Sequence, residues 1–131
     1  MDEVKLRNLN SEALAYAGDA VYELYVRSML LESGTARVNN LHRRATEYVK
    51  AAAQAKAIKE MFPELTEKEQ ALVKRARNHR FHSKAKNADP VTYKWATAFE
   101  ALVGYLYLAG DMDRMKRIMS WAVEITDNKR K

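Results

Sequence analysis

The chain has 131 residues, enough for one domain with an ordinary hydrophobic core. It contains no cysteine, which excludes disulfides and thiolate metal sites and fits a reducing compartment. The formal net charge of +6 favours a polyanionic partner.

The patterning of the chain predicts neither a secretory signal peptide nor a membrane span. Residues 1–10 lack the basic start and the apolar core of a signal peptide. No apolar run in the chain reaches the ~20 residues that a membrane span needs. We therefore expect a cytoplasmic protein without a membrane partner.

The pattern of apolar residues and helix signals predicts a single all-α domain over residues 1–131, with about five main helices. No stretch alternates strictly between apolar and polar residues, as a half-buried strand would. The first helix is predicted over residues 11–32, capped by Asn10 or Ser11. The second is predicted over residues 38–61, capped near Asn39 and closed before Pro63.

The second half of the chain contains further helix signals. Thr66 and Glu69 match the capping-box pattern and open a third helix, to about residue 77. Residues 78–88 lack apolar periodicity and are predicted to form a loop. Asp89 and Pro90 open a fourth helix to about residue 109. The fifth follows over residues 112–126, and the tail from about residue 127 is predicted to fray. The first and fourth helices are apolar nearly all round, so we expect them at the centre of the bundle or at a subunit interface.

Two acids stand alone in apolar stretches of these two helices. Asp19 is the only residue charged at neutral pH in residues 13–22, and Glu100 is the only one in residues 95–109. Because an unpaired charge is costly to bury, the two acids predict a positive group between them. A hard divalent metal is one candidate, and an internal ion pair with Arg27 or a histidine is the other.

The surroundings of Asp19 add two further hypotheses. Gly18 lies in mid-helix, where glycine costs about 1 kcal/mol relative to alanine, so we expect another helix or a ligand to approach closely there. Glu23 lies one turn after Asp19 on the same face and is the nearest candidate for a second carboxylate.

Basic residues gather in the segment 74–86, which holds six lysines and arginines and no acid. A segment of this kind indicates contact with nucleic-acid phosphates, although a charge run can also be a solvated face. A second basic cluster lies near the start of the second predicted helix. The candidate RNA-binding residues of both clusters are Arg43, Arg44, Lys74, Arg75, Arg77, His79, Arg80, Lys84 and Lys86.

Two sequence motifs resemble those of a known family. LAYAGDAVYE, residues 14–23, resembles the signature helix of the ribonuclease III family, and TAFEALVGYLYLAGD, residues 97–111, resembles its second motif. The resemblance implies a ribonuclease III-type helical domain in which Asp19 and Glu100 are catalytic and bind Mg²⁺. Glu23, on the same helix face as Asp19, is the candidate for a further ligand that acts through water. Ala15 and Thr97 stand where the family has its other two carboxylates.

The resemblance is to members of the family that lack a double-stranded-RNA-binding domain. It implies a metal-dependent endoribonuclease that works as a homodimer and cleaves double-stranded RNA. The implied substrate is the precursor of large-subunit (23S) ribosomal RNA, whose ends such an enzyme matures. The alternative is a non-catalytic helical RNA-binding or ribosome-assembly module with a decayed nuclease site.

Overall fold

The computed structural model describes residues 1–34, 37–80 and 89–129. These ranges contain helices and no strand, so the all-α prediction is confirmed, although the expected count of about five was low. None of the described helices is long and apolar enough to cross a lipid bilayer. The α-helices are α1 (Glu3–Arg7), α2 (Ser11–Glu32), α3 (Val38–Val49), α4 (Ala51–Met61), α5 (Glu67–Asn78), α6 (Pro90–Ala109) and α7 (Met112–Lys129), and a 3₁₀ turn, η1 (Phe62–Glu64), follows α4.

Local signals set the ends of the helices that carry the two isolated acids. The Asn10 side chain accepts a hydrogen bond from the Ala13 amide at 2.9 Å and so caps α2. Asp89 caps α6 in the same way, and Gly110 ends that helix with a positive φ of 82°. At α5 the predicted capping box is present, with reciprocal hydrogen bonds between Thr66 and Glu69.

The prediction of one helix over residues 38–61 is wrong. The chain is extended at Lys50 (φ −64°, ψ 153°), which separates α3 from α4. Residues 50–53 include no proline or glycine to signal a break. The two halves bury side chains against different partners, since α3 packs mainly on α2 whereas α4 packs mainly on α6. Tertiary packing therefore overrides the strong local helix preference of this alanine-rich stretch.

Smaller differences concern the helix ends. Arg37 rather than Asn39 precedes α3, and it makes no side-chain capping bond. The sequence patterns missed α1 and η1, and α7 continues to Lys129 instead of ending near residue 126. The predicted loop over residues 78–88 lies mostly outside the described residues.

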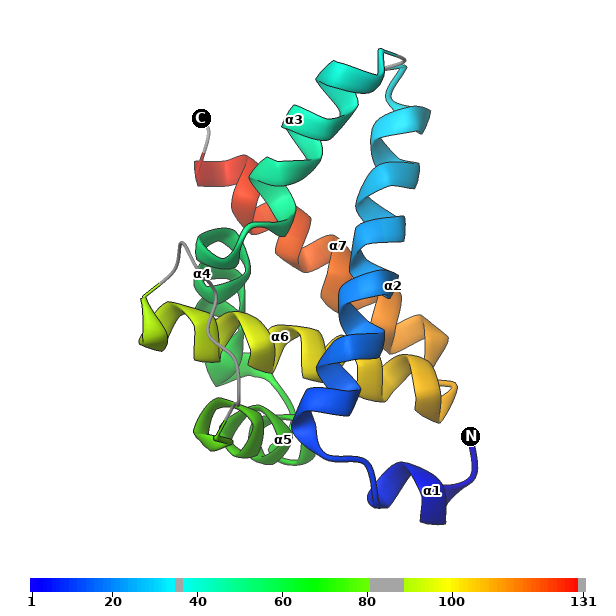
Figure 1. Cartoon of the computed structure of the whole chain (residues 1–131), viewed down its shortest axis with the longest axis vertical. Coiled ribbons are helices and arrows are strands. Elements are labelled where there is room, and N and C mark those ends of the chain that lie inside the picture. The colour runs from blue at the N-terminus through cyan, green and yellow to red at the C-terminus, as the bar shows by residue number, and fades with distance from the viewer. Residues whose placement is uncertain (35–36, 81–88, 130–131) are drawn as a thin grey trace.

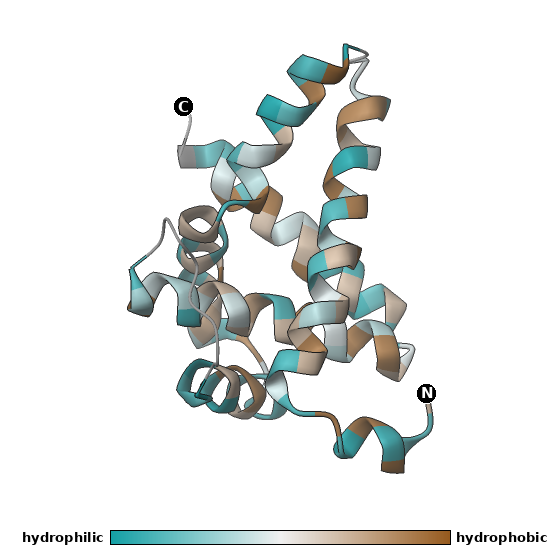
Figure 2. Ribbon diagram, in the orientation of Figure 1, coloured by the Kyte–Doolittle hydropathy of each residue, from teal (hydrophilic) through white to brown (hydrophobic). Residues whose placement is uncertain are grey.

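Helix α6 forms the centre of the molecule, with α2, α4, α5 and α7 packed around it (Figure 1). Its residues Phe99, Leu102 and Val103 are fully buried. Hydrophilic residues predominate instead on α5, which lies at the edge (Figure 2). The expected central position is confirmed for α6, whereas α2 buries one side only and leaves Tyr16 and Leu24 exposed.

Candidate active site

Two glycines bring α2 and α6 into backbone contact. A Cβ atom added to Gly18 would lie 1.7 Å from the carbonyl oxygen of Glu100, and one added to Gly104 would lie 1.9 Å from the carbonyl oxygen of Leu14. Both distances are far below van der Waals contact, so this crossing requires glycine on both helices. The predicted close approach at Gly18 is therefore the crossing of α6, and it places Asp19 beside Glu100.

The two isolated acids form a pair with unequal surroundings. Asp19 is exposed and Glu100 is half-buried, and their carboxyl groups lie close enough to interact. Desolvation, and next the charge of Asp19, raise the pKa of Glu100 to about 9. In the metal-free protein Glu100 is therefore protonated at neutral pH.

The expectation that burial forces a cation on Asp19 is wrong, because Asp19 is exposed to solvent. The alternative of an internal ion pair is also not found in the part of the chain that the structure describes. Arg27 binds Glu23 at 3.2 Å, and His79 lies 3.3 Å from Glu12. What favours a cation here is the pair itself, since two adjacent carboxyl groups disfavour double ionisation without a positive charge between them.

Gln54, on the first turn of α4, is a third polar group at this site. Its side chain is buried, with 3% of its surface exposed, and Nε2 donates to the carbonyl oxygen of Val49 at 3.0 Å. The amide also lies near the Glu100 carboxyl group and acts to lower its pKa. The sequence reading missed Gln54, although a lone uncharged polar residue within the run AAAQAKA could have drawn attention to it.

The remaining positions contribute less. Ala15 is buried, as is Thr97, and the Thr97 hydroxyl donates to the Tyr93 carbonyl at 2.8 Å. Among the described residues no group of three or more histidines, cysteines, aspartates or glutamates gathers as a metal cluster. An ion at Asp19 and Glu100 would accordingly keep much of its shell of water, as Mg²⁺ commonly does.

The candidate RNA-binding residues that the structure describes lie on α3, on α5 or directly after α5. On α5, Arg77 stacks on Trp95 with 5.0 Å between the guanidinium carbon and the ring centroid, and Lys74 lies 5.8 Å from the centroid of Phe62. Arg80 is exposed. On α3, Arg43 is exposed and Arg44 half-exposed. Lys84 and Lys86 lie outside the described residues.

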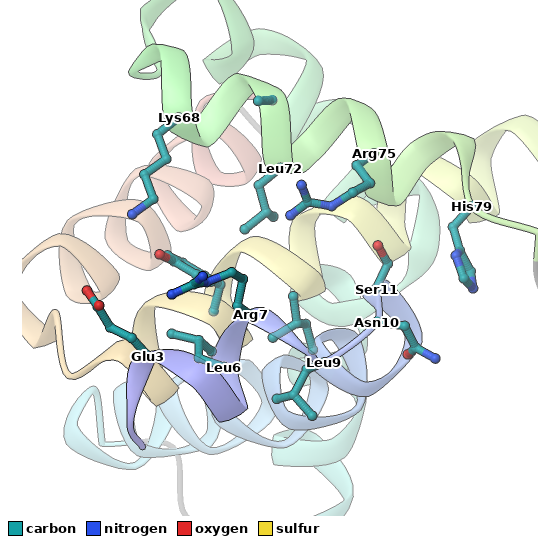
Figure 3. Close-up of a pocket in the computed structure, with 13 residues that line it drawn as sticks. Glu3, Leu6, Arg7, Leu9, Asn10, Ser11, Lys68, Leu72, Arg75 and His79 are labelled. Atoms are coloured by element: carbon teal, nitrogen blue, oxygen red, sulfur yellow. The ribbon is translucent and has the colours of Figure 1, made fainter.

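Arg75 and His79 line a cavity of about 620 Å³ between α1 and α5 (Figure 3). Lys68 joins them from α5, and Arg7 faces them from α1 above an apolar floor. Neither Asp19 nor Glu100 lines this cavity. These basic side chains therefore line a cavity that is separate from the acid pair.

An apolar surface runs along the outer side of α2. Tyr16 is 85% exposed and Leu24 is 68% exposed. Leu24 also lines a groove of about 790 Å³ that α2 forms with α7 and the end of α6. Exposed apolar side chains gathered at a groove are typical of an interaction surface.

Comparison with known proteins gives concordant matches. The ribonuclease III domain family matches residues 12–111. Mini-ribonuclease 3 of Symbiobacterium thermophilum is 51% identical over 114 residues, 87% of this chain and 88% of the relative. Mini-ribonuclease 3 of Streptococcus pneumoniae is 48% identical over 118 residues, 88% of this chain and 92% of the relative. A crystal structure of a protein from Fusobacterium nucleatum superposes with a TM-score of 0.80 at 29% identity, covering 90% of this chain and 94% of that one.

Proposed function

The chain belongs to the ribonuclease III family; from this premise we propose that it is an endoribonuclease that hydrolyses double-stranded RNA with Mg²⁺ held by Asp19 and Glu100. The observation that carries the proposal is the contact of these two carboxyl groups at the crossing of α2 and α6. Each acid lies in one of the two motifs that resemble the family.

The donor set fits a hard cation. Two carboxyl groups supply the oxygen ligands that Mg²⁺ prefers, and one or two such groups are a usual protein contribution to its shell. When bound, the ion supplies positive charge at the reacting phosphate and makes water more acidic. Asp19 is exposed, so an RNA backbone can reach it, whereas Glu100 is desolvated and fixed from the side of the core. Glu23 is proposed to assist through water, although its carboxylate is bound to Arg27.

Basic residues outside the pair are proposed to bind the RNA backbone. Phosphate contacts of this kind depend little on sequence and weaken with salt. A-form RNA is recognised mainly through its shape, its phosphates and its 2′-hydroxyl groups. The proposed contact residues are Arg43, Arg44, Lys74, Arg75, Arg77, His79, Arg80, Lys84 and Lys86.

A homodimer is proposed to form through the exposed side of α2. Tyr16 and Leu24 lie exposed on this side and would contribute apolar surface to the interface. Phe99 and Trp95 on α6 are not proposed to take part, because Phe99 is fully buried in the core and Trp95 is half-buried beneath Arg77. One site per subunit, related by a two-fold axis, would place one cut in each strand of a duplex.

The proposed substrate is the precursor of large-subunit (23S) ribosomal RNA, in the cytoplasm. The support is the likeness to relatives named Mini-ribonuclease 3, which extends over most of the chain. The competing function is a non-catalytic RNA-binding or ribosome-assembly module. It remains a candidate because only two of the four carboxylate positions of the family are acidic here.

Asp19→Asn separates hydrolysis from binding alone. We expect this variant to fold and bind an RNA duplex as the parent does, and to cleave it at least about 100-fold more slowly in Mg²⁺. Asp111→Asn is a matched control, because it removes an equal charge at the start of α7, where asparagine can still cap the helix. Cleavage by Asp19→Asn at the parent's rate would leave Asp19 with no catalytic role.

A further inference from the structure

Gln54 occupies an unusual position for an amide side chain. It lies on the first turn of α4, directly after the break at Lys50, and is almost fully buried. Its neighbours in the sequence are alanines, which bury no polar side-chain atom. A buried amide is favourable only when its N–H and C=O groups are satisfied, so the position needs a partner for each.

The Nε2 side of the amide is satisfied. One contact is the carbonyl of Val49, which ends α3 and has no partner further along its own helix. The amide also lies close enough to the Glu100 carboxyl group on α6 to favour its ionised form. The amide plane is therefore fixed between the end of α3 and the acid pair.

The Oε1 side is not satisfied. This oxygen is buried and finds no hydrogen-bond donor among the residues that the structure describes. A buried acceptor without a donor destabilises the folded protein, and a leucine in the same place would leave no such acceptor. Because Oε1 and Nε2 share one carbon atom, Oε1 belongs to the same amide group that interacts with the Glu100 carboxyl group.

We propose that Oε1 of Gln54 supplies a third, neutral oxygen to the divalent-cation site of Asp19 and Glu100, while Nε2 holds the amide in place. This inference rests on the proposed metal site and extends it to α4. Amide carbonyls are accepted by hard cations as ligands, either directly or through water in the ion's shell. This role for Gln54 would also explain the break at Lys50. A new helix that starts after Lys50 packs on α6 and brings Gln54 to the acid pair.

The test is Mg²⁺ binding to the RNA-free protein, measured by calorimetry. We expect Gln54→Leu to weaken Mg²⁺ binding by about 10–100-fold, the usual effect of removing a group that supports a metal site. Gln70→Leu is the matched control, because Gln70 Nε2 also donates to a backbone carbonyl, that of Phe62, at 2.8 Å. It loses the same kind of bond and should bind Mg²⁺ like the parent. Asp19→Asn should bind far more weakly than either.

The outcomes separate the inference from the function on which it rests. Parent-like binding by Gln54→Leu, with loss in Asp19→Asn, would overturn the role of Gln54 and leave the proposed function standing. Absence of Mg²⁺ binding in the parent would overturn both. If Gln54→Leu does not fold, the inference is tested by NMR on the side-chain amide groups of the parent protein. Mg²⁺ should shift the Cδ resonance of Gln54 and leave that of Gln70 in place, and an unmoved Gln54 signal refutes the inference.

Discussion

Substituting Glu100 should change how the stability of the metal-free protein depends on pH. The raised pKa means that native Glu100 keeps its proton up to about pH 9, whereas the unfolded chain releases it near the ordinary value of 4.5. Between these two values the native state binds one more proton than the unfolded state. The free energy of unfolding therefore falls as pH rises through this window.

The size of the effect follows from the width of the window. Each pH unit over which the native state holds one extra proton lowers stability by about 1.4 kcal/mol. From pH 4.5 to neutrality this amounts to at most about 3 kcal/mol, a large part of the stability of a small domain. Glu100→Gln cannot titrate, and its amide can still hydrogen-bond Asp19. The variant should lose this part of the pH dependence.

The assay is urea unfolding of the parent and Glu100→Gln in EDTA, at about pH 5 and about pH 8. We expect the parent to lose more stability than the variant between the two pH values. Asp19→Asn should lose less stability than the parent between the two pH values. The substitution removes the charge of Asp19, which is the second cause of the raised pKa of Glu100. Equal pH dependence in the parent and Glu100→Gln would refute the argument that Glu100 is held protonated.

Three further predictions concern the helix crossing, the basic residues and the apolar side of α2. Gly104→Ala should destabilise the protein by about 1–3 kcal/mol in urea unfolding. The added Cβ atom would lie 1.9 Å from the Leu14 carbonyl oxygen, and this clash outweighs the gain of about 1 kcal/mol in helix propensity. A variant more stable than the parent would contradict the close crossing of α2 and α6. Replacing Arg75 and Arg80 with glutamine should weaken duplex binding and flatten its salt dependence in filter-binding assays, and unchanged affinity would place the RNA elsewhere. Leu24→Asp should shift the protein toward a monomer in sedimentation experiments, whereas an undisturbed dimer would exclude this side of α2 as the interface.

The sequence by itself determined the elements that depend on neighbouring residues. The starts of α2 and α6 follow from Asn10, Asp89 and Pro90, whose capping chemistry acts within one turn. The close approach at Gly18 was also predictable, because glycine in mid-helix has a cost that packing must offset. Asp19 and Glu100 were identified as a pair from their isolation in apolar sequence and from the family motifs.

Only the tertiary structure decided the break at Lys50, the exposure of Asp19 and the place of Gln54. The alanine-rich stretch from residue 51 favours a helix but does not fix the orientation of that helix. The packing of α4 on α6 depends on residues far away in the sequence. Burial is likewise a sum over the whole fold, so an apolar helix such as α2 can keep one side exposed. The unequal surroundings of the two acids have the same origin, since desolvation depends on every element packed around Glu100.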